Sequence, residues 1–183
     1  NAAPSYTVNF NIAQRTKKAG YYLSGEYYRQ DGMFKKGNDI YDRYNMRAKV
    51  DFQLTNWLNI SNNTSFAFRK YDKPNIDMES FFHEVNRKST LDVVRNPDGT
   101  YTKSGGAILG LLENGGRSVN DRRDFSTTFA ATIDLLKDVW QIKADATFRR
   151  DSERTRRASL PYSYKQGPEM ALEQNTTTSS ARN

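Results

Sequence analysis

Polar and apolar residues alternate with a period of two in several separate runs of this chain. In the clearest run, from Tyr44 to Leu54, apolar residues occupy every second position and polar or charged residues occupy the positions between them. Because successive side chains of a β-strand point to opposite faces of a sheet, this pattern predicts strands with one apolar and one polar face. The alternation predicts six antiparallel strands, over residues 4–13, 20–29, 43–54, 58–69, 124–136 and 139–150.

The connections between these strands alternate in length. Short turns follow the first, third and fifth strands, whereas the second, fourth and sixth lead into long polar segments at 30–42, 71–123 and 151–183. Within the long segments the sequence predicts helices at Met78–Val85 and Ala107–Asn114, the second closed by Gly115, and a turn at Asn96–Gly99. Short turns at one end and long loops at the other are typical of outer-membrane barrels. We therefore assign the three long segments as extracellular loops.

The apolar faces carry small residues at mid-strand and aromatic residues near the strand ends. Ala48, for example, lies midway between Tyr44 and Phe52. A protein core needs bulky side chains at its centre, whereas strands that cross a bilayer carry aromatic girdles at both interfaces. We therefore expect the apolar face to meet lipid. The predicted lipid-facing residues are Leu23, Met46, Ala48, Val50, Phe52, Ile60, Phe66, Ile133, Ile142 and Ala144, and the predicted lumen-facing residues are Glu26, Arg47, Lys49, Asp51, Lys143 and Asp145.

The overall composition is compatible with this interpretation. Only 36% of the residues are hydrophobic, and no run approaches the eighteen apolar residues of a membrane-spanning helix. A spanning strand presents only alternate residues to lipid, so it can stay polar on average. The net charge of +7 does not predict a nucleic-acid partner, because the basic residues are interleaved with acids, as in the run from Arg149 to Arg157.

No catalytic or metal-binding group is evident in the sequence. The chain has no cysteine, which excludes thiol catalysis and disulfides, and its one histidine, His83, has no neighbouring ligand set. We predict no enzymatic activity, no cofactor and no metal. Tyr162 and Tyr164, in the last loop, either stack on a sugar ring of a ligand or cover the loop itself.

Several segments resemble SusC/RagA-type TonB-dependent transporters of the bacterial outer membrane. The resemblance is carried by Gly20–Gly32 (GYYLSGEYYRQDG), Tyr41–Asp51 (YDRYNMRAKVD), the turn Thr55–Leu58 (TNWL) and Val139–Asp145 (VWQIKAD). It implies a barrel of about 22 strands with a plugged lumen. It also implies import of an oligosaccharide or peptide, energy supplied by TonB, and a SusD-like lipoprotein partner. The plug and the TonB box are expected outside this stretch.

Six strands are too few to close a membrane barrel, because the smallest have eight. We therefore expect residues 1–183 to form part of one larger all-β barrel domain, in contact with membrane lipid, with lipopolysaccharide and with the remainder of the same barrel. Two alternatives remain open at this point. One is a soluble all-β binding module with a dry core, and the other is a small self-contained outer-membrane barrel.

Overall fold

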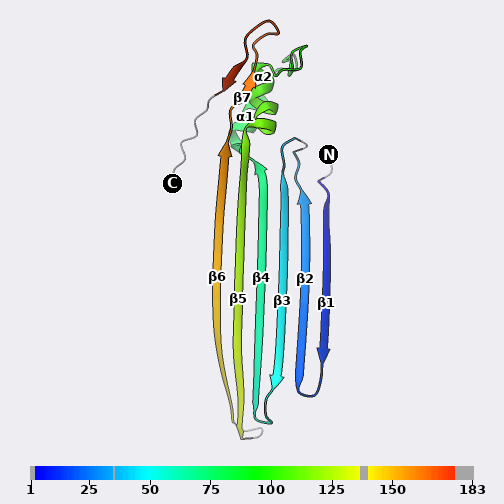
Figure 1. The fold of residues 1–183 in the computed structure, drawn as a ribbon, viewed down its shortest axis with the longest axis vertical. Helices are drawn as coiled ribbons and strands as arrows, with labels where there is room; N and C mark the ends of the chain where they lie inside the picture. The colour runs from blue at the N-terminus through cyan, green and yellow to red at the C-terminus, as the bar shows by residue number, and fades with distance from the viewer. Residues whose placement is uncertain (1–2, 35, 137–139, 176–183) are drawn as a thin grey trace.

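The computed structural model describes residues 3–34, 36–136 and 140–175 and shows one long antiparallel sheet (Figure 1). Its six strands pair in sequence order, each with its neighbours along the chain. The strands are β1 (Ser5–Arg15), β2 (Ala19–Asp31), β3 (Ile40–Gln53), β4 (Leu58–Pro74), β5 (Gly116–Leu136) and β6 (Trp140–Ser159). The predicted all-β class and consecutive antiparallel order are confirmed.

All six strands extend beyond at least one predicted end, and β4, β5 and β6 extend furthest, so the connections are shorter than the expected loops 30–42, 71–123 and 151–183. β4 continues to Pro74, β5 begins at Gly116, and β6 ends at Ser159. The ladder remains regular there, with Pro74 opposite Arg117 and Gly116 opposite Ser159. The alternation ends before the hydrogen bonds do, because residues at these strand ends are polar on both faces.

The connections are sorted by length between the two ends of the sheet (Figure 1). Residues 16–18 and 54–57 make short turns at one end, where the Thr16 amide donates to the Ala19 carbonyl at 2.7 Å. Residues 32–39 and 75–115 make long connections at the other end. Most of the predicted turn between the last two strands, residues 137–139, lies outside the described residues.

Both predicted helices occur in the long connection after β4. The first, α1 (Met78–Arg87), begins at Asp77, whose carboxylate accepts from the Ser80 amide at 2.9 Å. The second is one continuous run of α2 (Lys103–Gly105), the π-helical turn η1 (Gly106–Gly110) and α3 (Leu111–Asn114). It ends at Gly115, as predicted, but starts four residues early because Thr102 caps it. No helix in the described part of the chain is both long and apolar enough to cross a bilayer.

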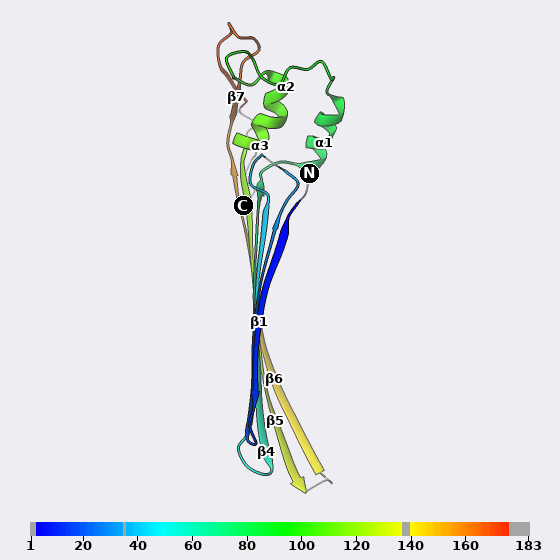
Figure 2. The ribbon, with the colours of Figure 1, turned by 90° about the vertical axis from the view of Figure 1, so that its right-hand side faces the viewer.

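The buried side chains lie in the long connections or at the strand ends next to them, and not along the middle of the sheet. Phe81, Tyr101, Leu112 and Tyr162 are less than 9% exposed, and Pro74 is fully buried. These residues, with loop 32–39, loop 75–115, β7 (Tyr162–Tyr164) and β8 (Glu173–Asn175), form a compact structure at the long-loop end that we call the loop cap. Figure 2 shows the cap at one end and the strands below it as a single layer. The described sheet is open, because β1 and β6 each pair with one strand.

Candidate functional site

The register of the sheet separates the side chains of all six strands into two faces. Met46 lies opposite Gly25 and Phe66, while Arg47 lies opposite Ser24 and Ser65. Following these rows across the ladder places all ten predicted lipid-facing residues on the face of Met46, which we call the apolar face. The six predicted lumen-facing residues all lie on the face of Arg47, which we call the polar face.

The apolar face is open along its length. Met46 is 52% exposed, Val50 45%, Ile142 48% and Leu23 38%, although these side chains are among the most apolar of the chain. Ile133 is half-buried between its cross-strand neighbours Leu58 and Ile142. The helices and long loops lie beyond one end of the strands (Figure 2). In the described residues, therefore, this face is not the inside of a protein core.

A row of aromatic rings marks the end of the apolar face nearest the loop cap. Tyr6 and Tyr27 contact edge to face with centroids 5.7 Å apart, and Tyr27 stacks on Tyr44 at 4.7 Å. Tyr44 in turn stacks on Phe68 at 6.0 Å. Offset and edge-to-face contacts of this kind are the favourable arrangements for aromatic pairs. The row thus forms a continuous aromatic boundary over β1–β4.

Aromatic residues also mark the opposite, short-turn end of the apolar face. Phe52 is 45% exposed there, and Trp140 is 64% exposed. From Tyr44 to Phe52 is eight residues, or about 27 Å of strand, which is about 20 Å of depth at a tilt near 40°. The ten residues from Phe125 to Leu135 correspond to about 26 Å on the same basis. Both heights are close to the roughly 25 Å apolar band of outer-membrane barrels.

Charged residues replace apolar ones immediately beyond the aromatic row. One row of direct cross-strand neighbours has alternating sign and consists of Arg29, Asp42, Lys70, Asp121 and Arg154. Opposite charges on adjacent strands stabilise a sheet, and they need water or lipid headgroups around them. Over β2–β4 this face therefore changes from aromatic to charged residues in a single step of the ladder.

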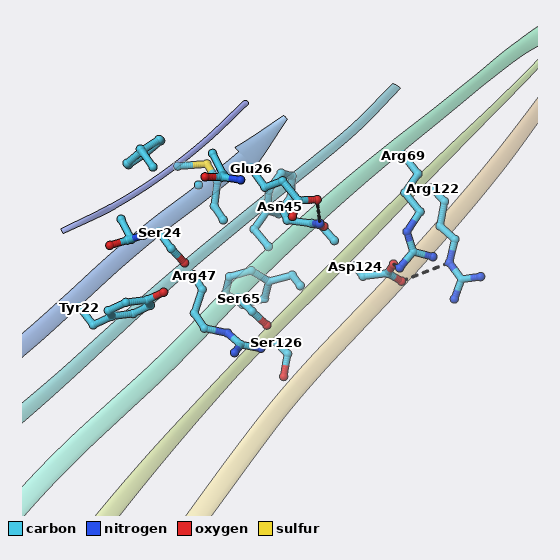
Figure 3. A pocket seen from close by; sticks show the side chains of 18 of the residues that line it. Tyr22, Ser24, Glu26, Asn45, Arg47, Ser65, Arg69, Arg122, Asp124 and Ser126 are labelled. Carbon is cyan, nitrogen blue, oxygen red and sulfur yellow. Dashed lines mark hydrogen bonds and ion pairs between the residues drawn. The ribbon is translucent and has the colours of Figure 1, made fainter. Parts of the chain in front are cut away.

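The polar face contains a hollow of about 850 Å³ that crosses all six strands (Figure 3). Two adjacent rows line it. The first row includes Ser24, Arg47, Ser65, Ser126 and Arg149, and the second includes Glu26, Asn45, Asp124 and Asp151. Hydroxyl, amide, carboxylate and guanidinium groups thus gather at mid-height of the sheet. Such a surface can form hydrogen bonds with a polar partner.

Most of the charges in and beside this hollow are paired. The Arg43 guanidinium lies 2.6 Å from the Glu26 carboxylate, which also accepts from Asn45 Nδ2 at 3.1 Å. Asp124 lies between two arginines, with Arg69 at 3.4 Å and Arg122 at 3.3 Å, and its side chain is only 17% exposed. These pairs hold the hollow rigid, since each partner fixes the rotamer of the other.

Arg47 differs from these residues. Within the described part of the chain it has no carboxylate or hydrogen-bond partner, and its neighbours in register are the hydroxyls Ser24 and Ser65. Figure 3 shows its side chain lying toward Ser65 and Ser126. Arg47 is the predicted lumen-facing residue that lies most centrally in the hollow. Glu26 also lines it, whereas Lys49, Asp51, Lys143 and Asp145 lie on the same face nearer the short turns.

Of the predicted lumen-facing residues only Glu26 and Arg47 line the hollow, and the lining residues that sequence reasoning did not name include Ser65, Arg69, Arg122, Asp124 and Ser126. Ser65 and Arg69 belong to the polar face of a predicted strand, so their side was evident from the alternation. The alternation predicts a strand that begins only at residue 124, which leaves Arg122 in the expected loop. The pairing of β4 with β5 brings Arg69 and Asp124 together from positions 55 residues apart in the sequence.

The loop cap is held together around Glu113. Its carboxylate accepts a hydrogen bond from the Tyr101 hydroxyl and lies 3.0 Å from Lys36 Nζ, which comes from the loop between β2 and β3. The Tyr101 hydrogen bond and the Lys36 ammonium hold the pKa of Glu113 below its ordinary value. Burial and the same bond raise the pKa of Tyr101. The two long connections, 32–39 and 75–115, are thereby joined.

The last loop contacts the rest of the cap through Tyr162 and through Lys165, whose ammonium group lies 2.8 Å from the Asp98 carboxylate. Tyr162 is 8% exposed, and a Cβ placed on Gly106 would lie 3.1 Å from its ring, so the two glycines Gly106 and Gly110 make room for it. Packing within the cap is therefore the role that the structure gives Tyr162. Tyr164 is half-buried, and its hydrogen bond with Glu173 raises its pKa. Stacking of Tyr164 on a ligand stays a prediction.

No group of three or more His, Cys, Asp or Glu residues in the described part of the chain is arranged to hold a metal ion. His83 is exposed on α1. Neither a protein-family model nor a curated protein sequence matches the chain.

Proposed function

We propose that residues 1–183 form a sector of an outer-membrane β-barrel that belongs to a SusC/RagA-type TonB-dependent importer. In this proposal the apolar face meets the bilayer, the polar face lines the lumen, the short turns are periplasmic and the loop cap is extracellular. The observation that carries it is the open apolar face, bounded at both ends by aromatic residues. Bilayers require this combination, and the centre of a protein core does not.

A soluble binding module accounts for these features less well. Soluble proteins rarely expose contiguous apolar patches above a few hundred Å², and here exposed apolar side chains follow all six strands. A sandwich would need a second layer over this face, and the described residues form only one layer. Loops sorted by length between the two ends also have no cause in a soluble domain.

The open edges of the sheet support a larger barrel. Unpaired backbone groups of β1 and β6 would be costly in hydrocarbon, so further strands must pair with them if the sheet spans a membrane. The hollow around Arg47 would then face the lumen, where its hydroxyls and arginines offer hydrogen bonds to a plug or to a passing solute. The small closed barrel is the weaker alternative, because the described β1 and β6 do not pair.

Assignment to a nutrient importer depends on the motif resemblance. The stretches around Tyr22, Arg47 and Trp57 resemble the SusC/RagA type, which implies uptake of an oligosaccharide or peptide with TonB and a SusD-like lipoprotein as partners. The assignment to a nutrient importer is tested by measuring the uptake of oligosaccharides and peptides. Loss of oligosaccharide or peptide uptake in a strain that lacks the protein, and equally in a strain that lacks TonB, supports it. Unchanged uptake of both substrate classes in both strains refutes it.

Cysteine labelling along β3 tests the orientation of the two faces. Because the chain has no cysteine, each introduced thiol is its only one. In outer membranes we expect a charged maleimide to label cysteines at 47, 49 and 51 and to leave those at 46, 48 and 50 unlabelled. All six should label after denaturation in detergent, which is the control for intrinsic reactivity. Equal labelling of both sets before denaturation would show that the apolar face is open to water.

A further inference from the structure

Three arginines gather at the outer edge of the apolar face, on β5 and β6. Arg150 and Arg154 lie two residues either side of Ser152, and Arg123 lies directly opposite Ser152 on the neighbouring strand. Side chains at such diagonal positions have Cβ atoms roughly 7–8 Å apart, within reach of long side chains. All three arginines are exposed, and the Arg123 guanidinium lies 5.6 Å from the centre of the Phe68 ring. We call them the arginine triad.

The triad has no carboxylate of its own. Within the described part of the chain, no Asp or Glu oxygen lies within ion-pair distance of any of the three. Asp121 is the cross-strand neighbour of Arg154, but its carboxylate pairs with Arg156 at 2.7 Å. By contrast, four arginines of the polar face at similar height are paired at 2.6 to 3.4 Å, namely Arg43, Arg69, Arg122 and Arg149, and only the central Arg47 is not paired among the described residues.

The position of the arginine triad indicates which kind of anion can bind to it. Arg123 lies in the same cross-strand row as Phe68 and Tyr44, the aromatic boundary of the apolar face. Arg150 lies opposite Phe125, the aromatic residue of β5 on that face that is nearest the loop cap. An anion held here would therefore sit at the edge of a surface that itself binds hydrocarbon. A molecule with acyl chains and a phosphate headgroup satisfies both parts of this surface.

We propose that the arginine triad binds the phosphate groups of an outer-leaflet lipid whose acyl chains lie against the apolar face. This inference rests on the proposed membrane location of the chain. Guanidinium groups donate paired hydrogen bonds to phosphate oxygens, so three of them can hold two phosphates without help from other residues. The triad would then fix the height of the barrel in the bilayer and seal lipid against β5 and β6.

Lipid binding to the purified protein tests this inference. The protein that contains the chain is held in micelles with either diphosphoryl lipid A or the same lipid after removal of its phosphates, and bound lipid is counted by native mass spectrometry. The test variant is R123Q/R150Q/R154Q. The matched control is R122Q/R149Q/R157Q, which removes the same charge from the same two strands on the polar face.

We expect the unchanged protein to bind diphosphoryl lipid A more tightly than the dephosphorylated lipid. The test variant should lose on the order of a hundredfold in affinity for the diphosphoryl form, at about fivefold per arginine, and the control variant should lose less than about threefold. Excess inorganic phosphate should not displace the lipid. If the triple variant does not fold, the single changes Arg150→Gln and Arg154→Gln should each show the fivefold loss.

Three results would overturn the inference. The two triple variants could bind lipid A equally, the phosphates could make no difference, or inorganic phosphate could displace the lipid, which would indicate a simple anion site. If the triad binds an acidic protein instead of lipid, removal of the lipid phosphates should make no difference to lipid binding. The membrane proposal itself is tested separately, by membrane extraction. Recovery of the protein in the aqueous fraction without detergent would refute it, whatever the lipid affinity.

Discussion

Ala48 offers a sharp test of where the apolar face lies, because it occupies the middle of that face on β3. It is four residues from Tyr44 and four from Phe52, which corresponds to about 13 Å of strand in each direction. Its neighbours in register are Leu23 and Thr64. The nearest acidic residue of β3 on this face, Asp42, is six residues away, or about 20 Å.

The change Ala48→Arg would therefore place an unpaired charge at the centre of the apolar band. If this face meets lipid, the substitution should reduce the free energy of unfolding by about 2–4 kcal/mol, the cost of arginine on the lipid face at the bilayer midplane. The control is Ser61→Arg, which adds the same charge to the polar face of β4, opposite Asp51. We expect it to change stability by less than about 1 kcal/mol.

Both variants can be measured by urea unfolding of the protein in lipid vesicles, followed by the fluorescence of Trp57 and Trp140. Both tryptophans are more than half exposed at the short-turn end. If the apolar face meets lipid, unfolding transfers them from the bilayer interface to water. The expected result is a lower midpoint for Ala48→Arg only. A cost for Ala48→Arg no greater than that for Ser61→Arg would refute the assignment of this face to lipid.

Two further predictions concern the loop cap. Gly37 has a φ of +73°, and a Cβ there would lie 2.6 Å from the Leu112 carbonyl oxygen, whereas Gly99 has a φ of +83° with nothing within 4 Å. Gly37→Ala should therefore weaken the cap by about 2 kcal/mol and Gly99→Ala by about 1 kcal/mol, measured by limited proteolysis of residues 75–115, and equal effects would contradict the proposed packing. The cap should also depend on pH. Asp98, bonded to Lys165 at 2.8 Å and to Thr100, has a lowered pKa, as has Glu113, so their stabilisation is present above the unfolded pKa near 4 and is lost as the pH falls through the folded values. Tyr101 has a raised pKa, so its contribution is lost only as the pH rises above about 10. After correction for the intrinsic exchange rate, hydrogen exchange of the cap amides should be slowest between these two pH limits. A corrected rate that keeps falling as the pH drops below 4 would contradict this account.

The sheet could be predicted from the sequence because alternation acts residue by residue. Met46 and Arg47 differ in polarity, and a strand must place them on opposite faces whatever surrounds it. The upper part of β5 gave no such signal. Between Arg117 and Asp124 both faces carry polar residues, so the period-two pattern disappears although the backbone pairing with β4 and β6 continues. The alternation therefore predicts a loop up to residue 123 and a strand only from Asp124 onward.

The hollow and the loop cap could not be predicted from the sequence, because they depend on contacts between residues far apart in the chain. Asp124 meets Arg69 only because β4 and β5 pair across a long connection, and the sequence alone does not set the register of that pair. Tyr162 was predicted either to stack on a ligand or to cover the loop. Which of these two roles Tyr162 has depends on Gly106 and Gly110, which face its ring from a helix more than fifty residues earlier. Long-range packing decided each of these roles.

Alternation fixes the faces of the strands but not their register, since a shift of two residues keeps apolar residues on the apolar face. For β3 and β4 the short turn at 54–57 fixes it, but β2 and β3 are joined by eight residues, 32–39. The aromatic row therefore fixes the register of β2 against β3, which that loop does not fix. Tyr27 stacks on Tyr44 and donates to Asp42 at 2.8 Å, and a shift of two residues would place Tyr44 opposite Gly25 or Arg29. An aromatic pair contributes about 0.5–1.5 kcal/mol beyond its burial, so the shifted pairing is disfavoured. The same tyrosines that mark the boundary of the apolar face thus also align the strands, which keeps that boundary at one height across the sheet.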